Sequence, residues 1–154
     1  MNQIPIWQRL LALLTYLLPW SDALPFGRAL FAVFPWLRLL QWPAQPLLFL
    51  QQAVPFGSFV LFLVLYLAVV RNPQVPQYLR FNALQAILLD ILLVVVSLGF
   101  NVLLSPLGDS IVLRTLNNTV FIGSLAVLLY AVLQSLQGKE VDLPTISEAV
   151  RMQL

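Results

Sequence analysis

Long apolar runs constrain this chain more than any other feature of its sequence. Three of them cover residues 53–71, 79–101 and 119–137, and a membrane-spanning helix needs about 20 mainly apolar residues. Of the 154 residues, 60% are hydrophobic and only 9% are charged, whereas a soluble domain carries about 25% charged residues. We therefore expect an all-α membrane protein that forms a single polytopic domain over residues 1–154.

A shorter apolar run at residues 4–20 predicts a fourth span. It is similar to a signal peptide, because one basic residue precedes an apolar stretch and the sequence Ser-Asp-Ala follows it. However, a single arginine is a weak basic region, and Pro19-Trp20 is typical of a helix end at the membrane interface. We favour a retained first helix, which gives four transmembrane helices.

Residues 26–50, between the first and second spans, are apolar but interrupted by prolines. Proline prevents one long straight helix, and the tryptophans of this region are typical of the membrane–water interface. We expect an interfacial helical segment that lies in the headgroup plane or dips part-way into the bilayer. The alternative is a second, kinked span.

A Pro-Phe-Gly sequence occurs twice, thirty residues apart, and each copy is followed by an apolar run. Proline fits the first helical turn, where its missing N–H is not needed. We therefore expect both copies to be the same kind of helix start. The residues are Pro25, Phe26 and Gly27 in the first copy, and Pro55, Phe56 and Gly57 in the second.

The tail at residues 138–154 is polar. Thr145 and Glu148 have the spacing of a capping box, and Ile146, Ala149 and Val150 would share one face of a helix that follows. The tail therefore predicts a short amphipathic helix on the membrane surface.

The charged residues indicate an orientation. With four spans, both termini lie on the side that holds five basic residues, and three basic residues lie on the other side. Basic residues concentrate in cytoplasmic loops, so we expect both termini in the cytoplasm or its plastid equivalent, the stroma. The same residues are scattered singly along the chain, which argues against a nucleic-acid interface.

The residue types in the chain exclude several kinds of functional site. The chain has no cysteine and no histidine, which excludes disulfides, thiolate nucleophiles, His-based triads and Cys/His metal sites. No nucleophile–base set or metal-ligand set is present, so we expect no enzyme, no cofactor and no metal.

Asp90 lies near the middle of the span at residues 79–101. An aspartate there costs about 2.5–3.5 kcal/mol, which the aliphatic and Phe residues of the span outweigh at about 0.3–0.6 kcal/mol each. Helical spacing gathers small and polar residues on one stripe, with a second amide at its edge. The stripe contains Asn82, Ala83, Ala86, Asp90, Ser97 and Asn101, and Gln85 lies at its edge.

The fourth helix carries a matching face with Tyr130 and Gln134, both potential donors to Asp90. Small residues allow helices to approach closely, and polar side chains bond across the interface. One interpretation of the stripe is therefore a satisfied packing seam. A second is a polar pathway or substrate groove, because intramembrane acids often mark transport routes. A third is a proton relay through Asp90.

Three segments together resemble a known family: VPFGSFVLFLVLYLAVVRN, YLRFNALQAILLDI and LPTISEAVRMQ. Their pattern is similar to that of the Tic-twenty family, the small membrane subunit of the translocon at the inner envelope of chloroplasts, with its cyanobacterial and plastid-encoded homologues. The resemblance implies four helices with both termini stromal or cytoplasmic. The start MNQIPIW has no transit peptide, so a plasma or thylakoid membrane of a cyanobacterium, or a plastid inner membrane, is expected.

The resemblance also implies a function: helping precursor proteins cross or enter a membrane as part of a larger complex. The expected partners are other membrane proteins of a translocon-like complex, the lipid bilayer and precursor polypeptides. Two alternatives remain open. The midplane carboxylate favours a subunit of a small-solute or ion transporter or channel, and the chain is also compatible with an assembly factor for other membrane complexes.

Overall fold

The computed structural model describes residues 4–108, 110–143 and 146–154, and within these ranges the regular structure is entirely helical. The helices, in chain order, are α1 (Ile6–Thr15), α2 (Leu17–Ala23), η1 (Leu24–Gly27), α3 (Arg28–Val33), η2 (Pro35–Ala44), α4 (Gln45–Ala53), α5 (Gly57–Leu65), η3 (Tyr66–Val70), α6 (Gln77–Leu103), η4 (Ser105–Leu107), α7 (Ile111–Leu136) and α8 (Ile146–Gln153).

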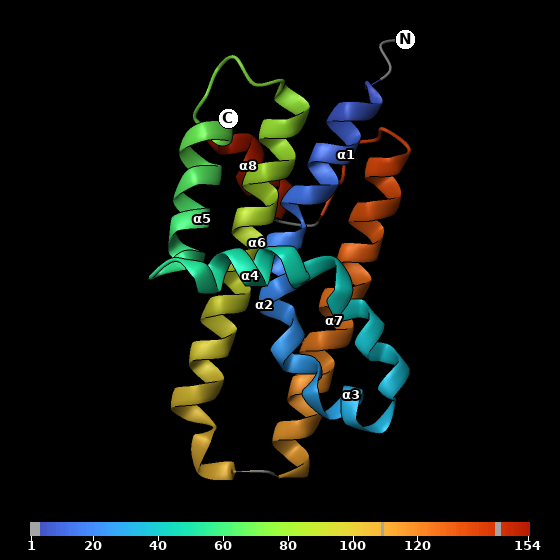
Figure 1. Ribbon diagram of the computed structural model, residues 1–154, viewed down its shortest axis with the longest axis vertical. Helices are drawn as coiled ribbons and strands as arrows, with labels where there is room; N and C mark the ends of the chain where they lie inside the picture. Colours follow the sequence, from blue (N-terminus) through green and yellow to red (C-terminus); the bar gives the residue numbers. More distant parts are fainter. Residues whose placement is uncertain (1–3, 109, 144–145) are drawn as a thin grey trace.

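Three stretches of the described chain are long and apolar enough to cross a membrane: Ile6–Val33, Gln77–Leu103 and Ile111–Leu136. They run along the long axis of the molecule (Figure 1). A fourth crossing is present if the bent pair Pro35–Ala53 and Gly57–Val70 counts as one span. The prediction of an all-helical membrane protein is therefore confirmed, with three candidate spans or four.

The first candidate span is longer than the sequence predicts, because it continues from Ile6 to Val33 instead of ending near residue 20. The α-helix breaks at Tyr16 and α2 begins at Leu17, so Pro19 falls in the first turn of a new helix. A proline is tolerated there because the first-turn N–H groups have no partner within the helix. As a result, Asp22 lies inside the span and not at its end.

The predicted interfacial segment at residues 26–50 is divided between two parts of the fold. Its first part is α3, which belongs to the first candidate span. The remainder, η2 and α4, forms the first arm of the bent pair, at 109° to the second arm. In Figure 1, α4 runs across the bundle near its mid-height. The Trp20 indole nitrogen donates to the carbonyl of Leu40 at 2.8 Å and ties η2 to α2.

The two Pro-Phe-Gly copies differ in conformation. The first forms η1 within a continuing helix, and a Cβ on Gly27 would lie 2.8 Å from the ring of Phe121. The second is the sharp turn into α5: Phe56 has φ of 55°, and a Cβ on Gly57 would lie 2.0 Å from the carbonyl oxygen of Gln51. Glycine is therefore needed once for helix packing and once for the turn between α4 and α5.

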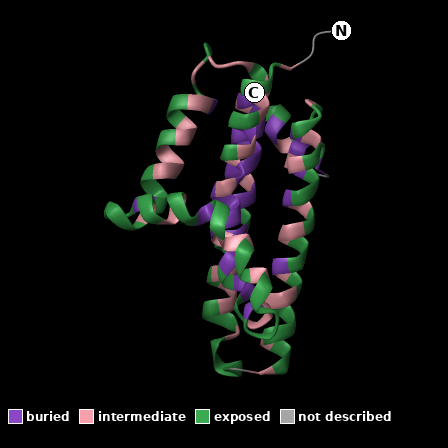
Figure 2. Ribbon diagram, turned by 45° about the vertical axis from the view of Figure 1, so that its right-hand side comes forward, coloured by how far each residue is buried: buried purple, intermediate pink, exposed green. Residues whose placement is uncertain are grey.

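The buried residues lie along the centre of the bundle, and the outward faces of the helices are exposed (Figure 2). One cluster joins the first span to α6 and α7 around Phe121, which contacts Trp20 and Phe31 at centroid distances of 5.7 and 5.4 Å. A second cluster packs α6 against α2, η3 and α8. The exposed faces are largely aliphatic, as expected for helices that contact lipid.

We expect Gly57→Ala to destabilise the protein, because the added methyl group collides with backbone and the turn cannot relax without moving α4. The measurement is the apparent melting temperature in detergent. The matched control is Gly123→Ala, also in a helix, where an added Cβ has nothing within 4 Å. Alanine is favoured over glycine in a helix by about 0.8–1 kcal/mol, so this control should keep or raise the melting temperature. Equal melting temperatures for the two variants would contradict the steric argument.

Candidate functional site

The predicted polar stripe on α6 is divided into three environments. Asn82 and Gln85 are fully buried, and Asp90 is almost fully buried. Ser97 is partly exposed and Asn101 is exposed. The stripe therefore changes from a sealed interior to an open surface along a single helix.

Asn82 and Gln85 belong to a buried hydrogen-bond network that reaches the first helix. The Tyr16 hydroxyl donates to Asn82 Oδ1 at 2.7 Å and accepts from Gln85 Nε2 at 3.0 Å. Asn82 Nδ2 donates to the carbonyl of Tyr78 at 2.8 Å. These donors and acceptors fix the orientation of both amides, since a flipped amide would place like groups together.

The same network reaches the chain after α7. Gln85 Nε2 also donates to the carbonyl of Val141 at 3.0 Å. The Ser147 hydroxyl donates to Gln85 Oε1 at 2.5 Å and accepts from the backbone N–H of Leu143 at 2.7 Å. The side chain of Gln85 thus joins α1, α6 and the C-terminal segment.

The C-terminal segment is consequently docked on the bundle. Val141, Leu143, Ser147 and Val150 are all buried, and α8 packs against α6. The predicted helix after Pro144 is present as α8, but its inner face meets protein. Thr145, half of the predicted capping box, lies outside the described residues.

Arg151 holds the outer edge of this segment. Its guanidinium lies 2.5 Å from Glu140 and 3.5 Å from Asp142, and 5.6 Å from the centroid of the Phe81 ring. The hydrogen bond to Glu140 raises the pKa of Arg151 above its ordinary value. The ion pairs are exposed to solvent and contribute little, so the buried network dominates the docking.

Asp90 has a different partner from the one predicted. Asp22 of α2 is the charged side chain that lies near it and interacts with it electrostatically, and Asp90 Oδ1 has no hydrogen-bond partner among the described residues. Tyr130 is 39% exposed on α7, and Gln134 is partly buried. The structure does not bring Tyr130 or Gln134 into a hydrogen bond with Asp90. Two adjacent carboxyl groups repel each other when both carry charge.

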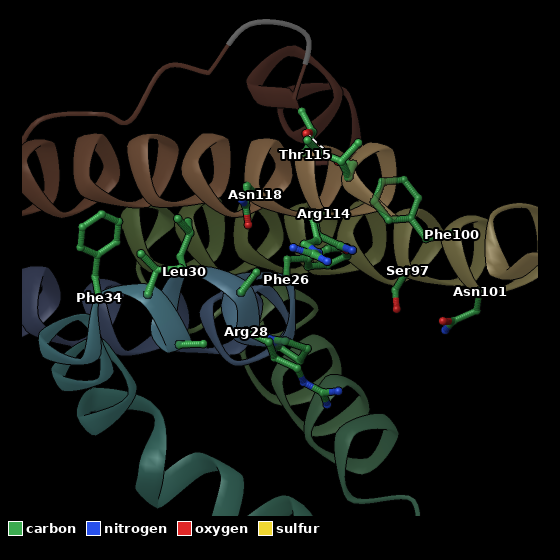
Figure 3. Close-up of a pocket in the computed structure, with 16 residues that line it drawn as sticks. Phe26, Arg28, Leu30, Phe34, Ser97, Phe100, Asn101, Arg114, Thr115 and Asn118 are labelled. Carbon is green, nitrogen blue, oxygen red and sulfur yellow. Dashed lines mark hydrogen bonds between the residues drawn. The ribbon is translucent and has the colours of Figure 1, made fainter. Parts of the chain in front are cut away.

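The lower part of the stripe opens into a cavity of about 930 Å³. Ser97 and Asn101 of α6 line it together with residues of α3 and the first turns of α7 (Figure 3). Two arginines, Arg28 and Arg114, also line it. From the sequence, both arginines are expected only among the basic residues between the spans that indicate the orientation in the membrane.

The residues that sequence analysis missed share one property. Tyr16, Asp22 and Ser147 each lie far along the chain from their α6 partners. A tyrosine in an apolar run or a serine in a polar tail carries no local signal of a buried role. Only the pairing with α6 identifies these residues. Within the described ranges, no group of three or more Asp or Glu residues is arranged to hold a metal ion.

We expect Gln85→Leu to release the C-terminal segment, because it removes three hydrogen bonds and leaves Tyr16, Ser147 and the Val141 carbonyl without them. Two of these bonds hold the C-terminal segment, and at about 1 kcal/mol each their loss should raise the open population about thirtyfold. The measurement is the rate of limited tryptic cleavage after Lys139 in detergent.

The control is Gln134→Leu. This residue is partly buried on α7, and its side chain forms no hydrogen bond within the described part of the chain. Cleavage after Lys139 should stay at the wild-type rate in this variant. A Gln85→Leu protein that is cleaved as slowly as wild type would show that the network does not hold the segment.

Comparison of the sequence with known proteins shows the family to which the chain belongs. The family described as chloroplast import apparatus Tic20-like matches residues 2–150. A Tic20 family protein of Synechocystis sp. is 40% identical over 95% of this chain and 92% of its own length. Protein TIC 20-II, chloroplastic, of Arabidopsis thaliana is 39% identical over 97% of this chain and 74% of its own length. The Tic20 family protein Ycf60 of Gracilaria tenuistipitata var. liui is 31% identical over 99% of this chain and 78% of its own length. The chain therefore belongs to the Tic20 family, the family that its sequence resembles.

Proposed function

We propose that this protein is an integral membrane subunit of a protein-translocation complex and helps precursor polypeptides cross or enter a membrane. The observation that carries the proposal is the family match over residues 2–150, because that family is described as chloroplast import apparatus. Relatives from Synechocystis and Arabidopsis, which match over 95% and 97% of this chain, support it. The partners would be other membrane proteins of that complex.

We further propose that the bent pair is the second of four crossings. Helix α1 begins and the chain ends at the same end of the bundle (Figure 1), which supports an even number of crossings. The second arm, α5 with η3, returns the chain to that end. The excess of basic residues on the same side favours a cytoplasmic or stromal location for both termini. The membrane would be a cyanobacterial plasma or thylakoid membrane, or a plastid inner membrane.

An apolar groove is the surface that we assign to the precursor. It has a volume of about 520 Å³ and lies between α1, α5 and the start of α6. Its lining is aliphatic and aromatic except for Thr15, and Leu47 of α4 contributes to it. The buried amides of the stripe are occupied by Tyr16 and the C-terminal segment, whereas this groove is open. An apolar segment of a precursor matches its lining better than a polar segment does.

Site-specific photo-cross-linking tests this assignment. We expect a probe at Val64, in the groove, to form adducts with a precursor arrested in transit. A probe at Ile122, on the outer face of α7, is the control, because both side chains are 56% exposed. Val64 should yield several-fold more precursor adducts than Ile122. Equal yields at both positions, or only lipid adducts at Val64, would contradict the assignment.

A second candidate function rests on the Asp22–Asp90 pair. A pair of carboxyl groups inside a membrane domain is typical of ion or proton pathways, which favours a transporter or channel subunit. Asp90→Asn separates the two functions, because an amide keeps the size of the side chain but cannot carry the proton. Under the translocation proposal, reconstituted wild type and Asp90→Asn should show the same proton leak in liposomes.

Loss of leak in Asp90→Asn, with wild-type circular dichroism and elution volume, would favour the transporter instead. The same variant would then be expected to keep the Val64 cross-link. The two measurements therefore separate a defect in proton movement from a defect in precursor contact.

A further inference from the structure

The cavity of about 930 Å³ lies at the end of the bundle opposite α8. It is lined by the last turns of α6, the first turns of α7 and most of α3. The helix α6 has 27 residues, so it is about 40 Å long. The hydrocarbon core of a bilayer is about 30 Å thick. The end turns of α6 and α7 therefore extend into the headgroup layer, and the cavity lies at that depth.

The polar side of this cavity carries two cations from different helices. Arg28 begins α3 and Arg114 is the fourth residue of α7. Arg28 is exposed and forms no hydrogen bond or ion pair with any residue in the described ranges. Arg114 has an interaction of its own, but a guanidinium has five N–H donors and retains capacity for an anion.

Amides add hydrogen-bonding groups next to these cations. Asn118 lines the cavity, and its Oδ1 is buried without a hydrogen-bond partner within the described chain. In Figure 3, Arg114 and Asn118 reach from α7 toward α3, and Ser97 comes from α6. An anionic group that also carries a hydroxyl would satisfy both the arginines and the orphaned acceptor.

Apolar side chains also line the cavity. Phe26 and Leu30 come from the first span, Phe34 is the residue after it, and Phe100 comes from α6. Phe26 meets Phe100 edge-on at a centroid distance of 5.8 Å. A ligand that contacts both the arginines and these apolar side chains must therefore be amphipathic, with an anionic head and a hydrocarbon chain.

We propose that this cavity is a binding site for one anionic membrane lipid. Its phosphate or sulfonate headgroup lies between Arg28 and Arg114, and an acyl chain follows the Phe26–Phe100 wall. The depth of the cavity places the cations level with lipid headgroups, and the aromatic wall distinguishes a lipid from a free anion. The site is independent of the proposed translocation function, since it involves neither the apolar groove nor a precursor.

Native mass spectrometry of the full chain tests the proposal. The delipidated protein is incubated with phosphatidylglycerol, with the uncharged lipid monogalactosyldiacylglycerol, or with inorganic phosphate. We expect phosphatidylglycerol to remain bound at about one per chain and the uncharged lipid to be lost. Because Arg28→Gln removes a charge-assisted hydrogen bond to the headgroup, it should weaken phosphatidylglycerol binding at least about tenfold. Arg28→Gln combined with Arg114→Gln should weaken it further.

Arg38→Gln is the matched control, because Arg38 is an exposed arginine on η2 that does not line the cavity. It should retain phosphatidylglycerol at the wild-type level. The single variant Arg28→Gln keeps the test decisive if the double variant fails to fold, since the Arg28 side chain has no partner to lose among the described residues. Equal retention of the charged and uncharged lipids would overturn the proposal. So would wild-type retention in Arg28→Gln, or occupancy by inorganic phosphate that phosphatidylglycerol does not displace.

Discussion

The hydrogen bonds of one buried amide, Gln85, organise the end of the bundle that carries both termini. Inside a membrane protein no bulk water replaces a lost partner, so a buried amide must be satisfied by protein. Gln85 uses both of its N–H groups and its oxygen, and the three partners come from Tyr16 between α1 and α2, from the segment after α7 and from α8. These three hydrogen bonds therefore fix the positions of these elements relative to one another. A second clamp lies above it, where Arg9 donates to the carbonyl of Leu136 at 3.2 Å, at the end of α7.

The cavity lies at the opposite end of the bundle. Gly27 lets the ring of Phe121 approach the first span, so α3 stays against α7 for a short distance. Beyond Val33 the chain turns away into η2, and the polar first turns of α7 are left facing a hollow. One helix, α6, thus connects a sealed polar network to an open cationic site. The acid pair lies between them.

Much of this arrangement follows from sequence, and the rest depends on contacts between distant segments. Run length and hydropathy predicted the span at residues 79–101, close to Gln77–Leu103. The start of α7 was placed too late, because Arg114 and the amides after it lower the hydropathy of turns that are still helical. Pro19 was interpreted as a helix end, although it occupies the first turn of a new helix. The role of Ser147 depends on Gln85, 62 residues away, and no local pattern contains that pairing.

The different burial of the polar residues along α6 also limits how such a chain can take part in translocation. Asn82 and Gln85 are fully buried and Asp90 is 7% exposed, so packed side chains close the stripe over its upper and middle parts. The cavity is confined to one end of the bundle, and the open groove at α1 and α5 is almost wholly apolar. Within the described residues, a single copy therefore offers no continuous polar route for a polypeptide. A route of that kind requires surfaces from a second copy or from other subunits, which is the physical reason that a translocation role implies a larger complex.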